Sequence, residues 1–446
     1  MCPLNNDILL LIFDQVDKKQ DCLTLLLICR QWYSLLLTKA YQSVRLGSDQ
    51  IHLLVRSVQN NPEISHAIKD LSITSGWRSE NDYNVEPLID TVKQVSPGDW
   101  ERWVDGLRDG EGDAWLAILT LFVTSVTSLS LNISGDSRFF LPMVARVAAR
   151  DKPFDSKSVL QHLKIVELET DDLKNSYYAT DCLPFLKLPS MRMFRASGLC
   201  EEQRGEPAFS KPGPRTSGVI ELDFGLGPCN GRKGMNDFIA ACANLEVFEY
   251  QHDDKAVWAE SYVGFRPRAF YNALCTQKHS LRELRLNNTG ESHSDDIDSE
   301  DDDGSVAWDD FGSLADFGQL RELHIPVRTL LQIGPHNRPP CSLDRVLPPN
   351  LELLNLAYYY QEDFGIVIEN LHSLLKHKEH RFCNLREIQV QPYCVLLKPG
   401  AIPHWSNFII PDLVQKGFTP FKEECNRLGV DFNFTKHGNH RVIRPT

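Results

Sequence analysis

The chain of 446 residues lacks the long apolar run that a membrane-spanning segment requires. Even its longest uninterrupted apolar runs, such as Ile8 to Phe13, are short, whereas a helix needs roughly 20 residues to cross a bilayer. The N-terminal run also lacks the preceding basic residues of a secretory signal, because the first Lys or Arg is Lys18. We therefore expect a folded N-terminal helix in a protein of the cytoplasm or the nucleus, with no membrane segment and no secretion.

Motifs for catalysis and metal binding are also missing. The twelve cysteines include no Cys-x-x-Cys pair, which argues against a disulfide framework or a structural zinc site. No Gly-x-Ser-x-Gly, phosphate-binding Gly-Lys-Ser/Thr or His-Glu-x-x-His motif occurs. The glycines at 225–231 miss the dinucleotide-binding spacing, and His377 and His380 lie in a charged stretch typical of an exposed helix end. We expect a non-catalytic protein with no cofactor and no metal.

The sequence contains no basic stripe that would indicate a nucleic-acid interface. The net charge is -13, and the block from 291 to 310 holds ten acidic residues and no Lys or Arg, so the rest of the chain carries -3. Nucleic-acid binding needs a concentration of positive charge, which this sequence does not have. Residues 290–310 contain too few apolar side chains to fold, and we expect a disordered insertion that either captures a basic partner or only solubilises the loop.

The first 46 residues are rich in leucine for their length. Asn5 or Asn6 can cap a helix whose consecutive apolar residues wrap around the whole circumference. A second apolar stretch runs from Leu23 to Cys29, and a third helix follows. Three short helices cannot bury so much apolar surface among themselves. Either a partner covers that surface, or the segment is a buried helical hairpin of an ordinary all-α domain.

This segment resembles an F-box, whose pattern is Leu-Pro-x-Glu-Ile-Leu-x-x-Ile-Phe-x-x-Leu, then a leucine-rich turn and Val-Cys-Arg-x-Trp. The matching positions are Leu4, Asp7, Ile8, Leu9, Ile12, Phe13, Val16, Leu23, Ile28, Cys29, Arg30 and Trp32. Asn5 replaces the usual proline, which leaves the approach to the helix looser and predicts weaker adaptor binding. The resemblance implies docking on the Skp adaptor of a cullin–RING ubiquitin ligase. The contacts that we expect come from Leu4, Asn5, Ile8, Leu9, Ile12, Phe13, Val16, Leu23, Cys29 and Trp32.

A pattern of the form apolar-x-x-apolar-x-apolar recurs ten times along the rest of the chain. Its copies begin at Ile68, Val126, Leu163, Met191, Val219, Leu245, Leu281, Leu320, Leu351 and Leu385. From Leu163 onward the steps are 28, 28, 26, 36, 39, 31 and 34 residues, and three copies open with Leu-Arg-Glu. Alternating apolar residues predict a short strand with one buried face, and each long connection allows successive strands to lie parallel.

The recurring pattern resembles irregular leucine-rich repeats. Asparagine is mostly missing after the third apolar position, and the later periods exceed the usual ~20–29 residues. The resemblance implies an α/β (α+β) repeat protein, in which a short three-helix F-box precedes an irregular leucine-rich-repeat-like solenoid with a parallel strand face. The alternative is an unrelated α/β fold with a parallel sheet.

The organisation that we expect begins with an F-box at 1–46 and a connecting helical segment at 47–67. The repeat region at 68–435 and a C-terminal tail at 436–446 follow. The repeat region includes a helical insertion at 77–125, a surface loop at 200–217 and the acidic insertion at 290–310. Within the helical insertion, Trp100 and Trp103 either pack in a core or line a groove. Thr419 is expected to cap a closing helix that runs from Pro420 to Leu428, before a last strand at 432–434.

Together these features favour a substrate-recognition subunit of a Skp–cullin–F-box ubiquitin ligase, with an unknown protein target on the repeats. The alternatives are a scaffold that binds the adaptor without ubiquitin transfer, and a plain repeat module whose N-terminus only caps the stack. Period-two geometry places polar side chains between the apolar ones, on the strand face where a target would bind. These candidate target-binding residues are Glu167, Arg195, Asp223, Glu249, Arg285, His324, Asn355 and Gln389.

Overall fold

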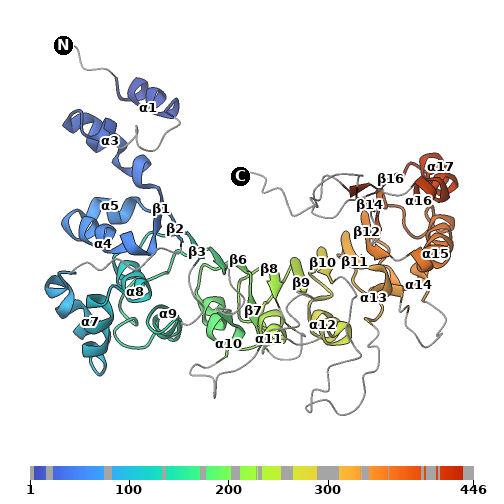
Figure 1. Ribbon diagram of the computed structural model, residues 1–446. Coiled ribbons are helices and arrows are strands. Elements are labelled where there is room, and N and C mark those ends of the chain that lie inside the picture. Colours follow the sequence, from blue (N-terminus) through green and yellow to red (C-terminus); the bar gives the residue numbers. More distant parts are fainter. Residues whose placement is uncertain are drawn as a thin grey trace. The chain divides into compact units, whose positions relative to one another are not determined.

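A computed structural model describes most of the chain, which forms two compact units (Figure 1). The described residues are 5–16, 24–74, 83–132, 137–170, 177–201, 211–227, 229, 234–252, 265–288, 311–331, 333, 341–359, 361–392, 396–397, 408–409 and 412–434. The first unit comprises 1–198 and 202–219, and the second comprises 199–201 and 220–446. The predicted acidic insertion at 290–310, part of the predicted loop (202–210) and the tail at 436–446 lie outside the described residues.

The first unit begins with helices and continues with alternating helices and strands. Its helical elements are α1 (Asn6–Asp14), α3 (Arg30–Tyr41), η1 (Ser48–Gln50), α4 (Ile51–Asn60), α5 (Pro62–Ala67), η2 (Glu86–Leu88), α6 (Ile89–Val95), α7 (Trp100–Arg108), α8 (Gly112–Phe122), α9 (Phe140–Ala149), α10 (Ala179–Cys182) and η4 (Leu183–Lys187). Its strands are β1 (Ser43–Gly47), β2 (Asp70–Thr74), β3 (Ser128–Asn132), β4 (Ile165–Glu169), β5 (Tyr177–Tyr178) and β6 (Met193–Ala196). The strands β1, β2, β3, β4 and β6 lie parallel in that order.

The second unit repeats the same arrangement. Its strands are β7 (Leu199–Cys200), β8 (Glu221–Gly227), β9 (Val247–His252), β10 (Glu283–Asn287), β11 (Glu322–Pro326), β12 (Leu353–Tyr359), β13 (Glu387–Pro392), β14 (Leu396–Leu397), β15 (Phe408–Ile409) and β16 (Asp431–Phe434). Its helical elements are α11 (Gly234–Ala241), α12 (Pro267–Leu274), η6 (Cys275–Gln277), α13 (Val327–Leu331), α14 (Leu343–Val346), η7 (Gln361–Asp363), α15 (Phe364–Lys376), α16 (Asp412–Gly417) and α17 (Thr419–Arg427). The strands β8 to β13 and β16 form a parallel sheet in chain order.

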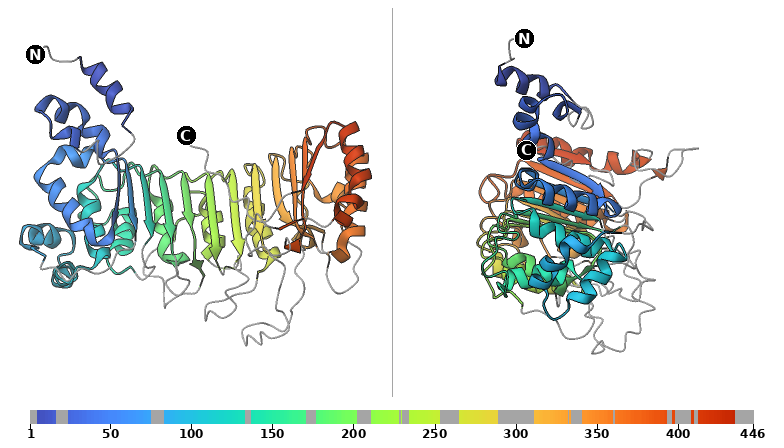
Figure 2. Two further views of the ribbon diagram at one scale, coloured as in Figure 1. Left: turned by 45° about the horizontal axis from the view of Figure 1, so that its top comes forward. Right: turned by 90° about the vertical axis from the view of Figure 1, so that its left-hand side faces the viewer.

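The strands predicted from the ten copies are all present with the predicted phase, and the predicted last strand at 432–434 is present as β16. In β10, for example, Leu284 and Leu286 are buried while Arg285 between them faces the other side. The first apolar residue of that copy, Leu281, is also buried and lies just before the strand. Within each unit the connecting helices lie on one face of the sheet (Figure 2). The other face carries the outward residues, because successive side chains of a strand point to opposite sides.

Aromatic rings packed at an angle to one another fill the core between strands and helices. In the second unit, the ring of Phe248 on β9 lies 6.1 Å from that of Phe224 on β8 and 6.3 Å from that of Phe270 on α12. All three side chains are fully buried. Each strand thus packs against its neighbour and against its own helix, which is how repeat proteins build one continuous core.

Three sequence-based expectations are corrected. Residues 43–47, expected to lie at the end of an F-box, form the strand β1, which pairs with β2 through Val44 and Leu71. The predicted boundary at 46/47 therefore cuts through a strand. Thr419 lies inside α17 and does not cap it, since its hydroxyl donates to the carbonyl of Gln415. Cys200, the first residue of the predicted loop at 200–217, lies in the strand β7, and its side chain is buried. The helices α7 and α8 in the predicted insertion at 77–125 are confirmed.

The half-buried carboxylate of Asp113 joins α8 to the start of α9. It accepts hydrogen bonds from Ser137 Oγ and from the backbone N–H groups of Arg138, Phe139 and Phe140, at 2.7 to 3.3 Å. Burial raises the pKa of Asp113, although these hydrogen bonds act in the opposite direction. The side chain thus satisfies the N–H groups that the first turn of a helix leaves without a partner.

Replacing Asp113 by Asn is expected to lower the free energy of unfolding of the first unit by about 2 kcal/mol, because an amide NH₂ would face backbone donors. Chemical denaturation followed by circular dichroism measures the change. Asp105→Asn is the control, since that carboxylate is exposed and should change stability by less than ~0.5 kcal/mol. Equal effects of the two substitutions would contradict the role of Asp113.

Candidate functional sites

Four exposed apolar side chains form what we call the N-terminal apolar surface. Ile8 and Leu11 on α1 are 46% and 64% exposed, and Leu27 and Ile28 before α3 are 84% and 59% exposed. Ile8 and Leu11 are three residues apart, so they share one face of α1. Gln31 Nε2 donates to Asn6 Oδ1 at 3.0 Å, which ties the first turn of α3 to the first turn of α1. Both pairs of apolar residues therefore flank the same junction.

A small core lies beneath this surface. Leu26, Leu36 and Ala40 are buried in it, and Val16, Trp32 and Tyr33 pack around them half-buried. This core is much smaller than the apolar content of the segment, which is why side chains such as Leu27 remain in water. Exposed apolar groups of this density mark a contact surface or an aggregation hazard.

Of the ten predicted adaptor-binding residues, Val16 and Trp32 pack half-buried around this core, and the other eight fall into three groups. Asn5 caps α1, because its Oδ1 accepts from the N–H of Asp7 at 3.2 Å, while Ile8 and Cys29 are exposed. Leu9 is fully buried within the protein, so the expectation that it contacts a partner is wrong. Leu4 and Leu23, and the side chains of Ile12 and Phe13, lie outside the described residues. Leu11 and Leu27 were missed, because the F-box pattern does not specify those positions.

The predicted target-binding residues lie in register across neighbouring strands. In the first unit, Glu167 on β4 pairs with Arg195 on β6, and Arg195 Nη1 lies 2.7 Å from Glu167 Oε1. In the second unit, successive strands β8 to β13 carry Asp223, Glu249, Arg285, His324, Asn355 and Gln389 at one level of the sheet. Asn433 on β16 extends this row, which we call the polar row.

Acidic residues at the start of the strands were missed, although the recurring Leu-Arg-Glu signalled them. Glu283, Glu322 and Glu387 are the glutamates of those three copies, and they lie two positions before the polar row. Arg285 lies among them: its guanidinium pairs with Glu283, lies 3.3 Å from Glu322 Oε2 and lies 3.9 Å from Glu249 Oε2. Burial alone would lower the pKa of Arg285, but these carboxylates outweigh it and raise that pKa.

His324 is adjacent to Arg285 in the polar row and stays neutral. Burial and the positive charge of Arg285 lower the pKa of His324 from 6.5 to about 4. Its Nε2 is buried and has no hydrogen-bond partner among the described residues. The Oδ1 atoms of Asn287, Asn288 and Asn355 are likewise buried and have no hydrogen-bond partner within the described part of the chain. The centre of this face therefore presents buried polar atoms that a ligand could satisfy.

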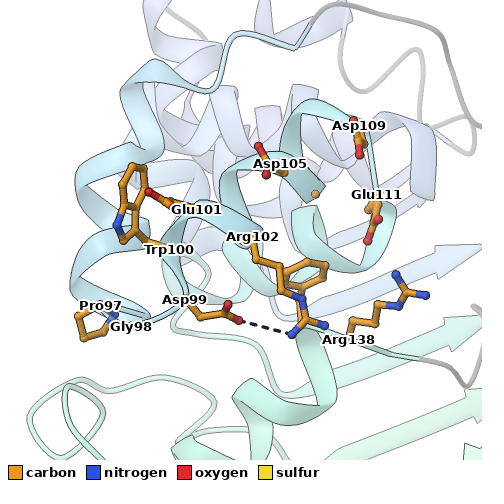
Figure 3. Close-up of a pocket in the computed structure, with 12 residues that line it drawn as sticks. Pro97, Gly98, Asp99, Trp100, Glu101, Arg102, Asp105, Asp109, Glu111 and Arg138 are labelled. Atoms are coloured by element: carbon orange, nitrogen blue, oxygen red, sulfur yellow. Dashed lines mark hydrogen bonds and ion pairs between the residues drawn. The ribbon is translucent and has the colours of Figure 1, made fainter.

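A separate cavity of about 560 Å³ lies in the helical part of the first unit (Figure 3). Trp100 lines this cavity, whereas Trp103 is buried in the core. Of the two alternatives given for this pair, lining a groove therefore describes Trp100, and core packing describes Trp103. Asp99 and Arg102 form an ion pair of 3.5 Å at its edge, and Arg102 lies over the ring of Phe139. Within the described residues, no group of His, Cys, Asp and Glu side chains could hold a metal ion. The described helices also include none with the length and apolar content to cross a membrane.

A family model described as a leucine-rich repeat domain matches residues 83–407, which is more than half of the chain. The chain belongs to the leucine-rich repeat family. No curated protein matches it. The strands β1 and β2 precede the matched residues, yet they continue the register of β3. The leucine-rich repeat stack of the first unit thus begins two strands before the matched range.

Proposed function

We propose that this leucine-rich repeat protein is the substrate-recognition subunit of a Skp–cullin–F-box ubiquitin ligase in the cytoplasm or nucleus. The observation that carries the proposal is the N-terminal apolar surface, which lies within a segment whose sequence resembles an F-box. A partner that covers Ile8, Leu11, Leu27 and Ile28 would remove their apolar area from water, which stabilises a complex. The Skp adaptor is the partner that the resemblance implies, and cullin and RING subunits would follow through it.

In this proposal the protein connects the adaptor to the target, and none of its residues takes part in the ubiquitin-transfer reaction. The N-terminal helices hold the adaptor, and the polar row holds a protein target. Tethering raises the effective concentration of a target lysine at the charged transferase, which accelerates transfer without a catalytic residue from this chain.

The double substitution Ile8→Asp and Leu11→Asp is expected to reduce co-purification of the Skp adaptor and of cullin by at least about tenfold. Two buried carboxylates at an apolar contact would each oppose binding strongly. Both side chains are exposed in the protein alone, so the substitutions should leave its fold intact. The measurement is affinity purification from cells treated with a proteasome inhibitor, followed by quantification of adaptor, cullin and trapped targets.

Leu53→Asp is the matched control, because Leu53 is an equally exposed leucine on α4, outside the N-terminal apolar surface. It should leave adaptor binding unchanged. Recovery of the adaptor without cullin would favour the alternative, a scaffold that does not promote ubiquitin transfer. Unchanged adaptor binding in the double variant would overturn the proposal and favour a plain repeat module.

A further inference from the structure

The strand face of the second unit is strongly acidic. Its strands contain seven acidic residues and a single basic one, Arg285; the acidic residues are Glu221, Asp223, Glu249, Glu283, Glu322, Glu387 and Asp431. Three of these carboxylates surround Arg285, so the cluster keeps a net negative charge. A face of this kind attracts cationic groups and repels anionic ones.

A chain of hydrogen bonds fixes the orientation of the Asn355 amide. The carboxylate of Glu387 can only accept, and it accepts from Gln389 Nε2 at 2.7 Å and from Asn433 Nδ2 at 3.3 Å. Gln389 must therefore turn its Oε1 toward Asn355, whose Nδ2 donates to it at 2.9 Å. The Asn355 Oδ1 is consequently not the atom that faces Gln389 on β13.

This oxygen is an acceptor that lacks a donor. Asn355 is 6% exposed, and its Oδ1 has no hydrogen-bond partner within the described chain. The register neighbour on β11 is His324, whose buried Nε2 is in the same condition. A neutral imidazole offers one nitrogen that accepts a hydrogen bond. Asn355 Oδ1 therefore calls for a ligand that brings N–H donors, and the His324 tautomer that leaves Nε2 unprotonated can accept from the same ligand, beside the carboxylate of Glu322.

We propose that the face between His324 and Asn355 is a subsite for a cationic side chain, arginine or lysine, of a protein target. Its N–H groups donate to Asn355 Oδ1 and to the His324 ring, and its charge is balanced by Glu322 and the neighbouring carboxylates. The neutral ring of His324 adds no repulsion. Naming this partner as the target of a ligase rests on the proposed function, whereas the chemistry of the subsite does not.

Two heptapeptides that differ only in charge test the subsite: acetyl-Gly-Arg-Gly-Arg-Gly-Arg-Gly-amide and the same peptide with citrulline at each arginine. The full chain is expected to bind the arginine peptide about tenfold more tightly, because citrulline keeps the shape but loses the charge-assisted hydrogen bonds. Isothermal titration calorimetry measures both affinities. Equal affinities would overturn the proposal.

Variants locate the binding. Asn355→Ala and Glu322→Gln should each lower the preference for arginine about fivefold or more, and the Glu322 change is safe for folding because that side chain is half-exposed. The control replaces Asp301, Asp302 and Asp303 in the acidic block by Asn. If this control removes the preference while Glu322→Gln does not, the block binds the peptide and the subsite is refuted.

The chain's own tail is the competing occupant, because 435–446 contains Lys436, Arg441 and Arg444 and no acidic residue. Replacing these three by Gln should leave the affinity for the arginine peptide unchanged. A gain of about tenfold would show that the tail fills the subsite, which overturns the assignment to a separate protein. The Ile8→Asp, Leu11→Asp variant should retain peptide binding. If the protein binds the adaptor but not the arginine peptide, only the subsite is refuted. If it binds the arginine peptide but not the adaptor, only the ligase role is refuted.

Discussion

Replacing Phe248 by Ala is expected to lower the free energy of unfolding of the second unit by about 4 kcal/mol, the largest effect of any single substitution considered. Phe248 is fully buried, and its ring contacts Phe224 of the preceding strand and Phe270 of the helix that follows. Truncation removes the apolar surface and leaves a cavity that the neighbouring rings cannot fill. Guanidinium denaturation measures the loss, and hydrogen exchange at β8, β9 and β10 should show where it is concentrated.

Leu226→Ala is the matched control for Phe248→Ala. Leu226 lies on β8, and its side chain is partly in water. Because its removal opens no cavity, the change in free energy should stay below ~1 kcal/mol. Comparable losses for the two variants would mean that the packed rings of Phe224, Phe248 and Phe270 do not form the core of this unit.

Lowering the pH from 7 to 4 is expected to destabilise the second unit through His324, by roughly 3 kcal/mol. The pKa of this ring is 6.5 when unfolded and about 4 when folded, because of burial and of Arg285. Between these values the unfolded chain binds the extra proton, so its population rises as pH falls. The stabilising effect of a neutral His324 is fully present above pH 6.5 and is lost progressively as the pH falls from 6.5 to about 4.

The comparison of His324→Gln with His377→Gln isolates this effect. Glutamine cannot take up a proton, so the first variant should lose about 3 kcal/mol less between pH 7 and 4 than the parent protein. His377→Gln is the surface control, because the side chain of His377 is 51% exposed. Parallel curves for the parent and His324→Gln would show that His324 is not buried beside Arg285. Denaturant titrations at a series of pH values provide the measurement.

The strands could be predicted because burial on one face leaves a short, local signature. Leu284 and Leu286 flank Arg285, and this alternation needs no knowledge of distant residues. The strand β1 shows the limit of the approach. Tyr41, Val44 and Leu46 have the same apolar spacing as the other copies, but the tyrosine also fits the F-box helix, and it indeed lies in α3. Only the pairing with β2 resolves this overlap.

The candidate sites were less predictable because they depend on contacts between distant residues. A helix that is apolar all round does not reveal which side docks, so the sequence could not separate the buried Leu9 from the exposed Leu11. The polar row was placed correctly from strand phase, yet the burial of Asn355 follows from its three-dimensional surroundings. The hydrogen-bond chain through Glu387 joins residues 46 positions apart, from 387 to 433, which no local pattern encodes.

The alternation within each strand also constrains how this gene product can vary in length over evolution. One residue inserted between Leu284 and Arg285 would turn Arg285 toward the helices and Leu286 toward water. The connections between strands have no such alternation to preserve. Lengthening a connection only raises the entropic cost of closing the loop, and that cost grows slowly with length. Insertions and deletions should therefore accumulate between strands, as the spacings of 26 to 39 residues within this single chain already illustrate. New recognition loops can arise in these connections, while each strand keeps the same residues on its buried face and on its outward face.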